Sequence, residues 1–254
     1  MLLFVTMILI GILIGFTGAG GAGTVIAVLT AIFGIPVHTA LGTSLASMIF
    51  TSLSGTLSHF KAHNVVLKIG LITGLFGAIG SFIGAQIAGF IDEDILKYCT
   101  AGMMTFSAFL LWRRLFMTQR PSKTKTASKS VNNSTNLIAK GAFVGIITGC
   151  LSGFLGIGAA PFIQIGLLTI FGLTAKKAVG TTMLVILPIA FVGGFGYYII
   201  GHLDIPLFIK VVCGTIIGSY IGAKLTAYAN EAFLKVVMIA VPIASALLLI
   251  FGKQ

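Results

Sequence analysis

The chain has 254 residues, 57% hydrophobic and only 8% charged, with a mean hydropathy of +1.11. This composition excludes an ordinary soluble domain and predicts a multi-pass membrane protein. The net charge of +11 does not indicate nucleic-acid binding, because seven of the sixteen Lys and Arg residues lie between Arg113 and Lys140, where they act as a topology signal. The cysteines lie in apolar segments without CxxC spacing, so we expect no disulfide framework and no metal site: Cys99, Cys150 and Cys213.

The apolar runs are nearly continuous and do not alternate as the strands of a membrane barrel would, so we predict an all-α helix bundle. Glycine-rich stretches at residues 15–24 and 153–162 break two of these runs. The flanking runs hold only about 13 or 14 residues each, or roughly 20 Å of helix against a hydrocarbon core of about 30 Å. We therefore expect two short broken-helix, or re-entrant, pairs: residues 3–16 with 22–34, and 141–154 with 160–172.

Three longer runs follow each broken pair, and each is near the length that a spanning helix needs. They are residues 39–60, 66–91 and 95–112, and then 175–200, 205–228 and 233–250. Between the two sets lies a basic segment rich in Ser, Thr and Asn, which predicts a flexible, water-exposed linker. The domain prediction is a first transmembrane repeat at 1–112, a linker at 113–136 and a second repeat at 137–254.

The two repeats match at a constant separation of 138 positions. Matching glycines run from the first short helix to the last spans without a gap: Gly11 with Gly149, Gly42 with Gly180, and Gly84 with Gly222. An offset that survives over this length predicts an internal duplication.

Positive charge lies at different loops in the two repeats. Lys61 and Lys68 flank a loop of the first repeat whose equivalent, residues 201–205, has no Lys or Arg, whereas Lys176 and Lys177 have no basic Lys or Arg equivalent in the first repeat. By the positive-inside rule these loops face opposite sides, so the repeats are predicted to be inverted. The same rule places the linker 113–136 in the cytoplasm and both termini outside.

Inverted repeats with broken helices indicate a secondary transporter whose site lies near the midplane. Glycines permit close backbone approach, and the N-termini of the second short helices present free N–H groups that favour anions. Nearby hydroxyls and one amide add donors, and no Asp or Glu lies within a predicted span. The predicted substrate-binding residues are Gly18, Gly20, Gly21, Ala22, Gly23, Thr43, Ser44, Gly156, Gly158, Ala159, Ala160, Pro161, Gln164, Thr181 and Thr182.

These residues also have simpler structural interpretations. A single glycine in a membrane helix most often serves close helix packing, although clustered glycines at both breaks favour the site. Thr43 and Ser44 are as well explained by hydrogen bonds to backbone carbonyls, and His59, His63 and His202 by an interfacial position.

The segments GFTGAGGAGT with IFGIPVHTALGTSLAS, and GFLGIGAAPFIQIGLLTIFGLTAKKAVGTTM, resemble the duplicated signature of the TauE/SafE family of sulfite exporters and sulfur-organoanion permeases. The resemblance covers nearly the whole chain outside the linker. It implies a multi-pass transporter of the cytoplasmic membrane that moves sulfite or a similar small sulfur-containing anion, with no cofactor.

The predicted function is secondary transport of such an anion by alternating access between the two glycine breaks. A passive anion channel of the same fold is an alternative, because no sequence feature reports gating. An intramembrane hydrolase would need a nucleophile and a base, for which Ser44, Ser54 or Ser58 with His59 are candidates, but no GxSG motif is present. We therefore predict that the protein is not an enzyme; its expected partners are a small anion and the lipid bilayer.

Overall fold

The structure of the chain is a computed structural model that describes residues 2–17, 22–113, 134–157 and 159–251. Within these residues every regular element is an α-helix, which confirms the predicted all-α class there. In chain order the helices are α1 (Leu2–Thr17), α2 (Ala22–Ala31), α3 (Val37–Lys61), α4 (Leu67–Ala88), α5 (Glu93–Trp112), α7 (Ser134–Leu155), α8 (Ala160–Thr169), α9 (Ala175–Ile199), α10 (Ile205–Tyr228) and α11 (Glu231–Phe251).

Seven of the described helices are long and apolar enough to cross a membrane: α3, α4, α5, α7, α9, α10 and α11. They include all six long runs expected from the sequence, with ends that differ by a few residues. Helix α1 has 16 residues, and α2 and α8 have 10 each. A helix of ten residues covers about 15 Å, or about half of the hydrocarbon core. The prediction of a multi-pass helix bundle is therefore confirmed.

Helix α7 corrects one prediction. The run 141–154 was expected to be a short arm, but the helix extends over Ser134–Leu155 and is 22 residues long. Lys140 interrupts the apolar sequence at the expected boundary, but Leu137, Ile138 and Ala139 before it are apolar and belong to the helix. A single lysine does not end a membrane helix, because its long apolar stem lets the charge reach the interface. Residues 114–133, most of the predicted linker, lie outside the described residues.

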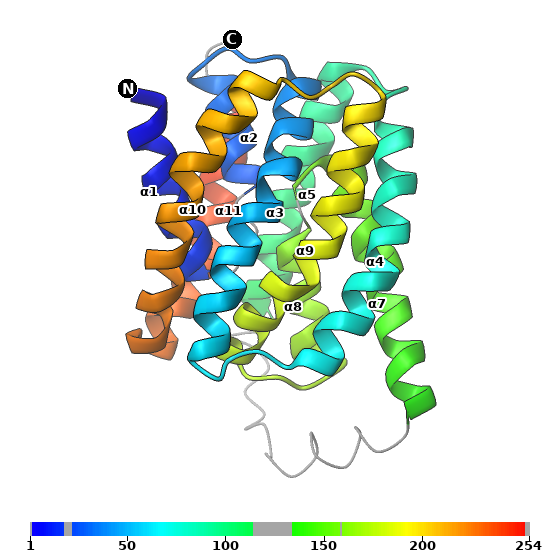
Figure 1. Ribbon diagram of the computed structural model, residues 1–254, viewed down its shortest axis with the longest axis vertical. Coiled ribbons are helices and arrows are strands. Elements are labelled where there is room, and N and C mark those ends of the chain that lie inside the picture. Colours follow the sequence, from blue (N-terminus) through cyan, green and yellow to red (C-terminus); the bar gives the residue numbers. More distant parts are fainter. Residues whose placement is uncertain (1, 18–21, 114–133, 158, 252–254) are drawn as a thin grey trace.

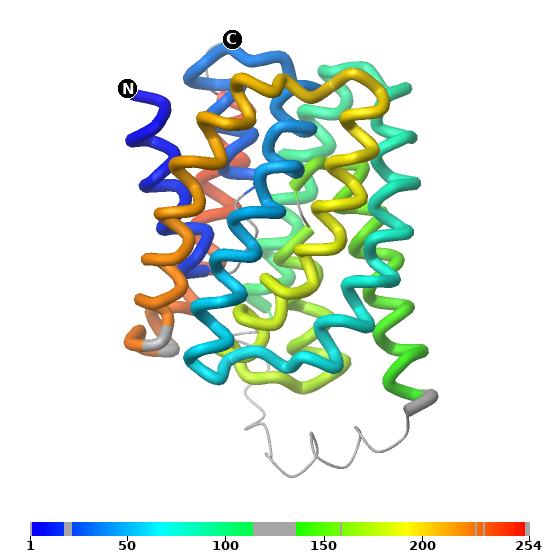
Figure 2. Tube along the Cα trace, in the orientation of Figure 1, coloured from blue at the N-terminus to red at the C-terminus, as the bar shows by residue number. Residues whose placement is uncertain are grey.

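Corresponding helices of the two halves run in opposite directions in Figure 1. Helix α3 runs from the upper end of the bundle to the lower end, whereas α9 runs from the lower end to the upper. The short helices follow the same pattern, since Figure 2 places α2 in the upper half and α8 in the lower half. Helix α1 packs along α10, and α7 packs along α4, so each half contributes a helix to a pair with the other.

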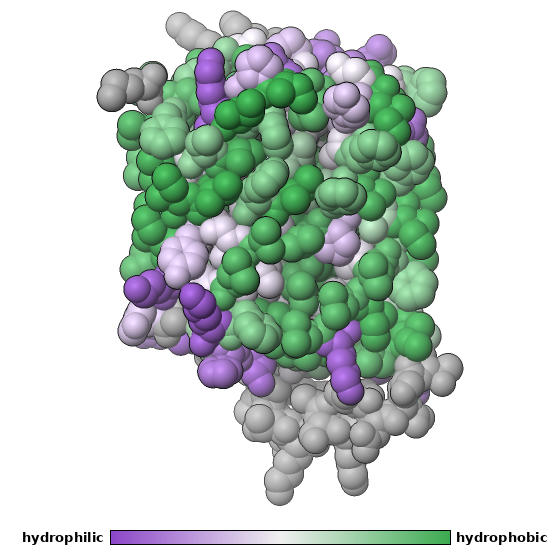
Figure 3. Space-filling view, in the orientation of Figure 1, coloured by the Kyte–Doolittle hydropathy of each residue, from purple (hydrophilic) through white to green (hydrophobic). Residues whose placement is uncertain are grey.

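The outer surface of the bundle is a belt of apolar side chains, with polar residues gathered at the two ends (Figure 3). Many large apolar side chains are exposed on this belt, among them Leu75, Phe109, Phe143 and Leu247. Such exposure is expected where the surroundings are lipid rather than water. Helices α3 and α9 are the most buried of the seven spans and lie at the centre of the bundle.

Two pairs of helices touch along their backbones. A Cβ atom added at Gly15 of α1 would meet the carbonyl oxygen of Ser219 in α10, and one at Gly153 of α7 would meet the carbonyl oxygen of Ser81 in α4. Only glycine allows backbones to approach this closely, as is common between membrane helices. The simpler interpretation of many glycines, close packing, therefore applies to these positions.

Candidate functional site

The second glycine break joins α7 to α8 through two residues in the left-handed region. Gly156 has a φ of +61° and Ala159 a φ of +41°. Ala159 is the N-cap of α8, and its carbonyl oxygen accepts hydrogen bonds from the N–H groups of Phe162 (2.9 Å) and Ile163 (3.0 Å). Pro161 lies in the first turn of α8, where a missing N–H is not needed. The break thus leaves the start of α8 inside the protein, with Ala159 and Ala160 fully buried.

Two hydrogen bonds from side chains tie the breaks to their neighbours. Gln164 Nε2 of α8 donates to the carbonyl oxygen of Thr17, the last residue of α1, at 3.1 Å. Ser44 Oγ of α3 donates to the carbonyl oxygen of Gly156 at 3.3 Å. Because Thr17 directly precedes the first break, the Gln164 bond brings the second short helix to it. The end of α1 and the first turns of α8 are therefore adjacent in the fold although they are far apart in sequence.

The predicted site residues fall into three groups. Four of them, Gly18, Gly20, Gly21 and Gly158, lie outside the described residues. Gly23 and Pro161 line a cavity between the breaks. The others are buried but do not line that cavity, and they are Ala22, Thr43, Ser44, Gly156, Ala159, Ala160, Gln164, Thr181 and Thr182.

The threonines of α3 and α9 differ in their hydrogen bonding. Thr181 Oγ1 accepts a hydrogen bond from the backbone N–H of Val66 at 3.0 Å and so supports the start of α4. Among the described residues, the hydroxyls of Thr43 and Thr182 and Oε1 of Gln164 are buried without a hydrogen-bond partner. Buried polar atoms without partners are rare and point to a bound water or to a functional role. All three residues are fully buried, and none of them lines the cavity.

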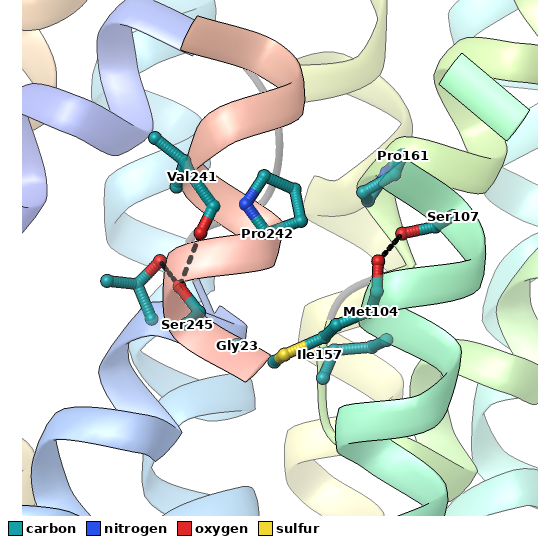
Figure 4. A pocket seen from close by; sticks show the side chains of 9 residues that line it. Gly23, Met104, Ser107, Ile157, Pro161, Val241, Pro242 and Ser245 are labelled. Carbon is teal, nitrogen blue, oxygen red and sulfur yellow. Dashed lines mark hydrogen bonds between the residues drawn. The ribbon is translucent and has the colours of Figure 1, made fainter. Parts of the chain in front are cut away.

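The cavity lies between α2, α5, α11 and the second break, as Figure 4 shows. The cavity has a volume of about 20 Å³, which is room for about one water molecule, so a larger substrate needs the surrounding helices to move apart. Its lining residues are Gly23, Thr24, Met104, Ser107, Ile157, Pro161, Val241, Pro242 and Ser245. Seven of them were not predicted: Thr24, Met104, Ser107, Ile157, Val241, Pro242 and Ser245.

Three hydroxyl groups supply the side-chain polarity of the cavity. Ser245 Oγ donates to the carbonyl oxygen of Val241 at 2.8 Å and also lies 2.8 Å from Thr24 Oγ1. Ser107 Oγ donates to the carbonyl oxygen of Met104 at 2.7 Å. None of the nine lining residues carries a charge. A hydroxyl that bonds its own helix can turn to a ligand without breaking the helical ladder, so these groups can serve a small polar molecule.

Six of the lining residues form pairs at the offset found in the sequence. Gly23 and Pro161, Met104 and Pro242, and Ser107 and Ser245 are each separated by 138 positions. The offset was a signal that could have identified Ser107 and Ser245, since it places two serines at equivalent points of the third long helices.

Comparison with known proteins identifies the family. The family profile described as "Sulfite exporter TauE/SafE" matches residues 3–249. The chain belongs to this family. The "Probable membrane transporter protein YdhB" of Bacillus subtilis is 50% identical over 252 residues, which cover 99% of this chain and 100% of that protein. A "Probable membrane transporter protein" of Methanocaldococcus jannaschii is 30% identical over 253 residues, covering 93% and 90%. No solved structure matches the chain.

Membership of the TauE/SafE family confirms the resemblance carried by the two glycine-rich segments. This chain is accordingly a membrane transporter of that family. Its cavity is built by the two glycine-rich segments together with α5 and α11.

Proposed function

We propose that this TauE/SafE chain is a secondary transporter of small anions, in which two inverted repeats rock around one central cavity. The substrate is sulfite or a sulfur-containing organic anion, in line with the family description. The protein lies in the cytoplasmic membrane with the linker on the cytoplasmic side and both termini outside. It needs no cofactor and performs no covalent chemistry.

The inverted arrangement is supported by contacts that recur at equivalent positions. His59 Nε2 lies 3.2 Å from the carbonyl oxygen of Gly15, and the Tyr197 hydroxyl donates to the carbonyl oxygen of Gly153 at 3.0 Å. Both contacts join residues 44 positions apart, and the members of the second pair lie 138 positions after those of the first. Each half thus holds the end of its broken helix in the same way.

Contacts between the halves recur as well. A Cβ atom at Gly42 would meet the carbonyl oxygen of His202, and one at Gly180 would meet the carbonyl oxygen of Asn64. Exchanging the two halves exchanges these two contacts. Such reciprocity is the signature of a pseudo-two-fold axis between the repeats, as in transporters built from inverted repeats.

The observation that carries the proposal is the position of the cavity between the breaks, with three equivalent pairs among its lining residues. A site on the pseudo-two-fold axis is accessible from opposite sides in turn when the halves rock against each other. Its hydroxyl donors suit an oxyanion, and no lining carboxylate opposes a negative charge.

Proteoliposomes containing the full chain test the proposal. Uptake of sulfite, thiosulfate, sulfoacetate and a non-sulfur carboxylate is measured with and without the same anion inside. We expect saturable uptake of at least one sulfur anion that is accelerated by counterflow. A conductance far above the turnover of a carrier would show that the protein is a channel and not a transporter. No anion flux at all would reject both functions.

A variant of the cavity tests the position of the site. A Cβ atom at Gly23 would meet the end of the Met104 side chain, so Gly23→Val fills the cavity without touching a backbone. We expect uptake to fall by at least tenfold while the protein remains folded. Gly102→Val is the control, because a Cβ atom there meets nothing within 4 Å. Equal uptake in both variants would show that the substrate site does not lie at this cavity.

A further inference from the structure

Helix α5 carries one basic residue on its buried face. Lys97 exposes only 8% of its surface, although lysine is almost never buried without a partner. The residues that follow it on the same face, Thr100, Ala101, Met104 and Ser107, are also buried, and the last two line the cavity. Lys97 therefore lies on the face of α5 that leads to the cavity, seven residues and about 10 Å of helix from Met104.

Helix α11 carries a lysine at the equivalent place. Lys235 lies 138 positions after Lys97 and is half-buried. Seven residues separate it from Pro242, the lining residue that corresponds to Met104. The same face of α11 continues through the buried residues Met238, Pro242 and Ser245.

The two lysines approach the cavity from opposite ends of the bundle. Helix α5 begins at the upper end and α11 at the lower end (Figure 1), and both lysines lie in the second turn of their helices. The cavity residues lie near the middle of both helices. The order along the bundle is thus Lys97, the uncharged cavity, and Lys235.

Neither lysine is matched by a carboxylate within ion-pair distance among the described side chains. An unpaired ammonium group inside a membrane bundle is costly, and such residues mark ion pathways. At about 10 Å, a cation attracts an anion without holding it as tightly as a direct contact does. A positive charge at each entrance attracts the anion, and the absence of charge in the cavity prevents binding so tight that release becomes slow.

We propose that Lys97 and Lys235 are the two entrance cations of the anion path, each drawing the substrate toward the cavity from its own side of the membrane. This inference rests on the proposed function, because it assigns specificity residues to the same cavity. Their action is electrostatic, so either lysine tolerates replacement by arginine but not by a neutral side chain.

Side-specific kinetics test the inference. Uptake of sulfite, or of the panel anion that the wild-type carries fastest, is measured in right-side-out and in inverted membrane vesicles. We expect Lys97→Gln to raise KM about tenfold from one side and Lys235→Gln from the other, which corresponds to about 1.4 kcal/mol in each case. The maximal rate changes less, and higher salt reduces the difference from wild-type.

Matched controls separate this effect from misfolding. Lys210 and Lys224 of α10 are exposed lysines, and Lys210→Gln and Lys224→Gln leave KM unchanged from both sides. Lys97→Arg and Lys235→Arg keep KM within about twofold of wild-type because the charge is retained. If both glutamine variants change KM equally from both sides, or leave it unchanged while the wild-type transports, the entrance role is wrong. Absence of anion flux in the wild-type would instead reject the proposed function.

Discussion

The two halves of the bundle resemble each other in how their helices pack and differ in how they line the cavity. Gly15 and Gly153 face carbonyl oxygens at equivalent positions of the opposite half. By contrast, the equivalent of Gly23 is Pro161, and the equivalent of Thr24 is Phe162. The helix contacts thus use identical residues in both halves, whereas only one of the three equivalent lining pairs, Ser107 with Ser245, is identical.

This difference follows from what each region must fit. A helix contact through a glycine has no room for any side chain, so both halves need the same residue. The cavity is shared by the halves, and under the proposed function it holds a single substrate, so its lining does not need the same residue in both halves. Substitution of one lining residue, such as Pro242 opposite Met104, then adapts the site without disturbing the packing.

The largest expected effect disrupts the helix packing that the two halves share. Gly15→Leu and Gly153→Leu each place a side chain against a backbone carbonyl that cannot move aside, that of Ser219 or Ser81. We expect each variant to lose about 3 kcal/mol of stability or more, at the upper end of overpacking costs. Size-exclusion chromatography after heating measures the loss, and Gly102→Leu is the unhindered control. If only one of the two glycines is sensitive, the helix contacts are not equivalent.

Hydropathy was sufficient to predict the spans because lipid demands apolar residues over a fixed length. The start of α7 was missed because Lys140 interrupts the apolar sequence, although Leu137, Ile138 and Ala139 before it belong to the helix. The glycine breaks were also apparent, since clustered glycines interrupt a helix at a defined point. What hydropathy cannot report is which face of a helix turns inward.

The candidate site was predicted in part for that reason. Gly23 and Pro161, two of the predicted substrate-binding residues, line the cavity, whereas the hydroxyl of Thr181 accepts a hydrogen bond from the N–H of Val66. Ser107 and Ser245 were missed because a serine inside a spanning helix usually bonds its own backbone, as both do here. Only the packing of α5 against α11 shows that these two hydroxyls face the same space.

A smaller effect tests whether two different side chains perform the same task. Tyr197→Phe removes the hydrogen bond to Gly153, and His59→Phe removes the one to Gly15. Each variant leaves a buried carbonyl oxygen with one partner fewer, which we expect to cost about 1–2 kcal/mol. Thermal midpoints measured side by side check this, and the two losses should agree. A large loss for one variant alone would mean that His59 and Tyr197 are not functional equivalents.

A still smaller effect probes the turns that follow the short helices. Gly34 and Gly172 have φ values of +64° and +65°, and a Cβ atom at either position meets nothing within 4 Å. Alanine at either position therefore costs only the left-handed conformation, about 1 kcal/mol. Thermal midpoints of Gly34→Ala and Gly172→Ala should fall equally. Unequal shifts of the thermal midpoint would show that the two turns contribute differently to the stability of the folded protein.

The smallest effect concerns a difference between the halves at the upper end of the bundle. His202 lies in the loop before α10, and its ring stacks on that of His38 with centroids 4.7 Å apart. Burial, and then the neighbouring His38, lower the pKa of His202 below that of a free histidine, against a smaller opposing effect of Glu93. The residue at the equivalent position of the first half is Asn64, which does not titrate.

The sign of the resulting pH dependence is fixed by linkage. Because the folded pKa lies below the unfolded one, the unfolded chain binds more protons between these two values, and stability falls as the pH decreases through that window. We expect the thermal midpoint of the wild-type to decrease modestly from pH 7 toward pH 5 and that of His202→Asn, which copies the other half, to decrease less. Differential scanning of both proteins in the same detergent measures the two slopes. If the thermal midpoints of both proteins decrease equally with pH, another group causes the acid sensitivity and the stacked pair His38 and His202 does not.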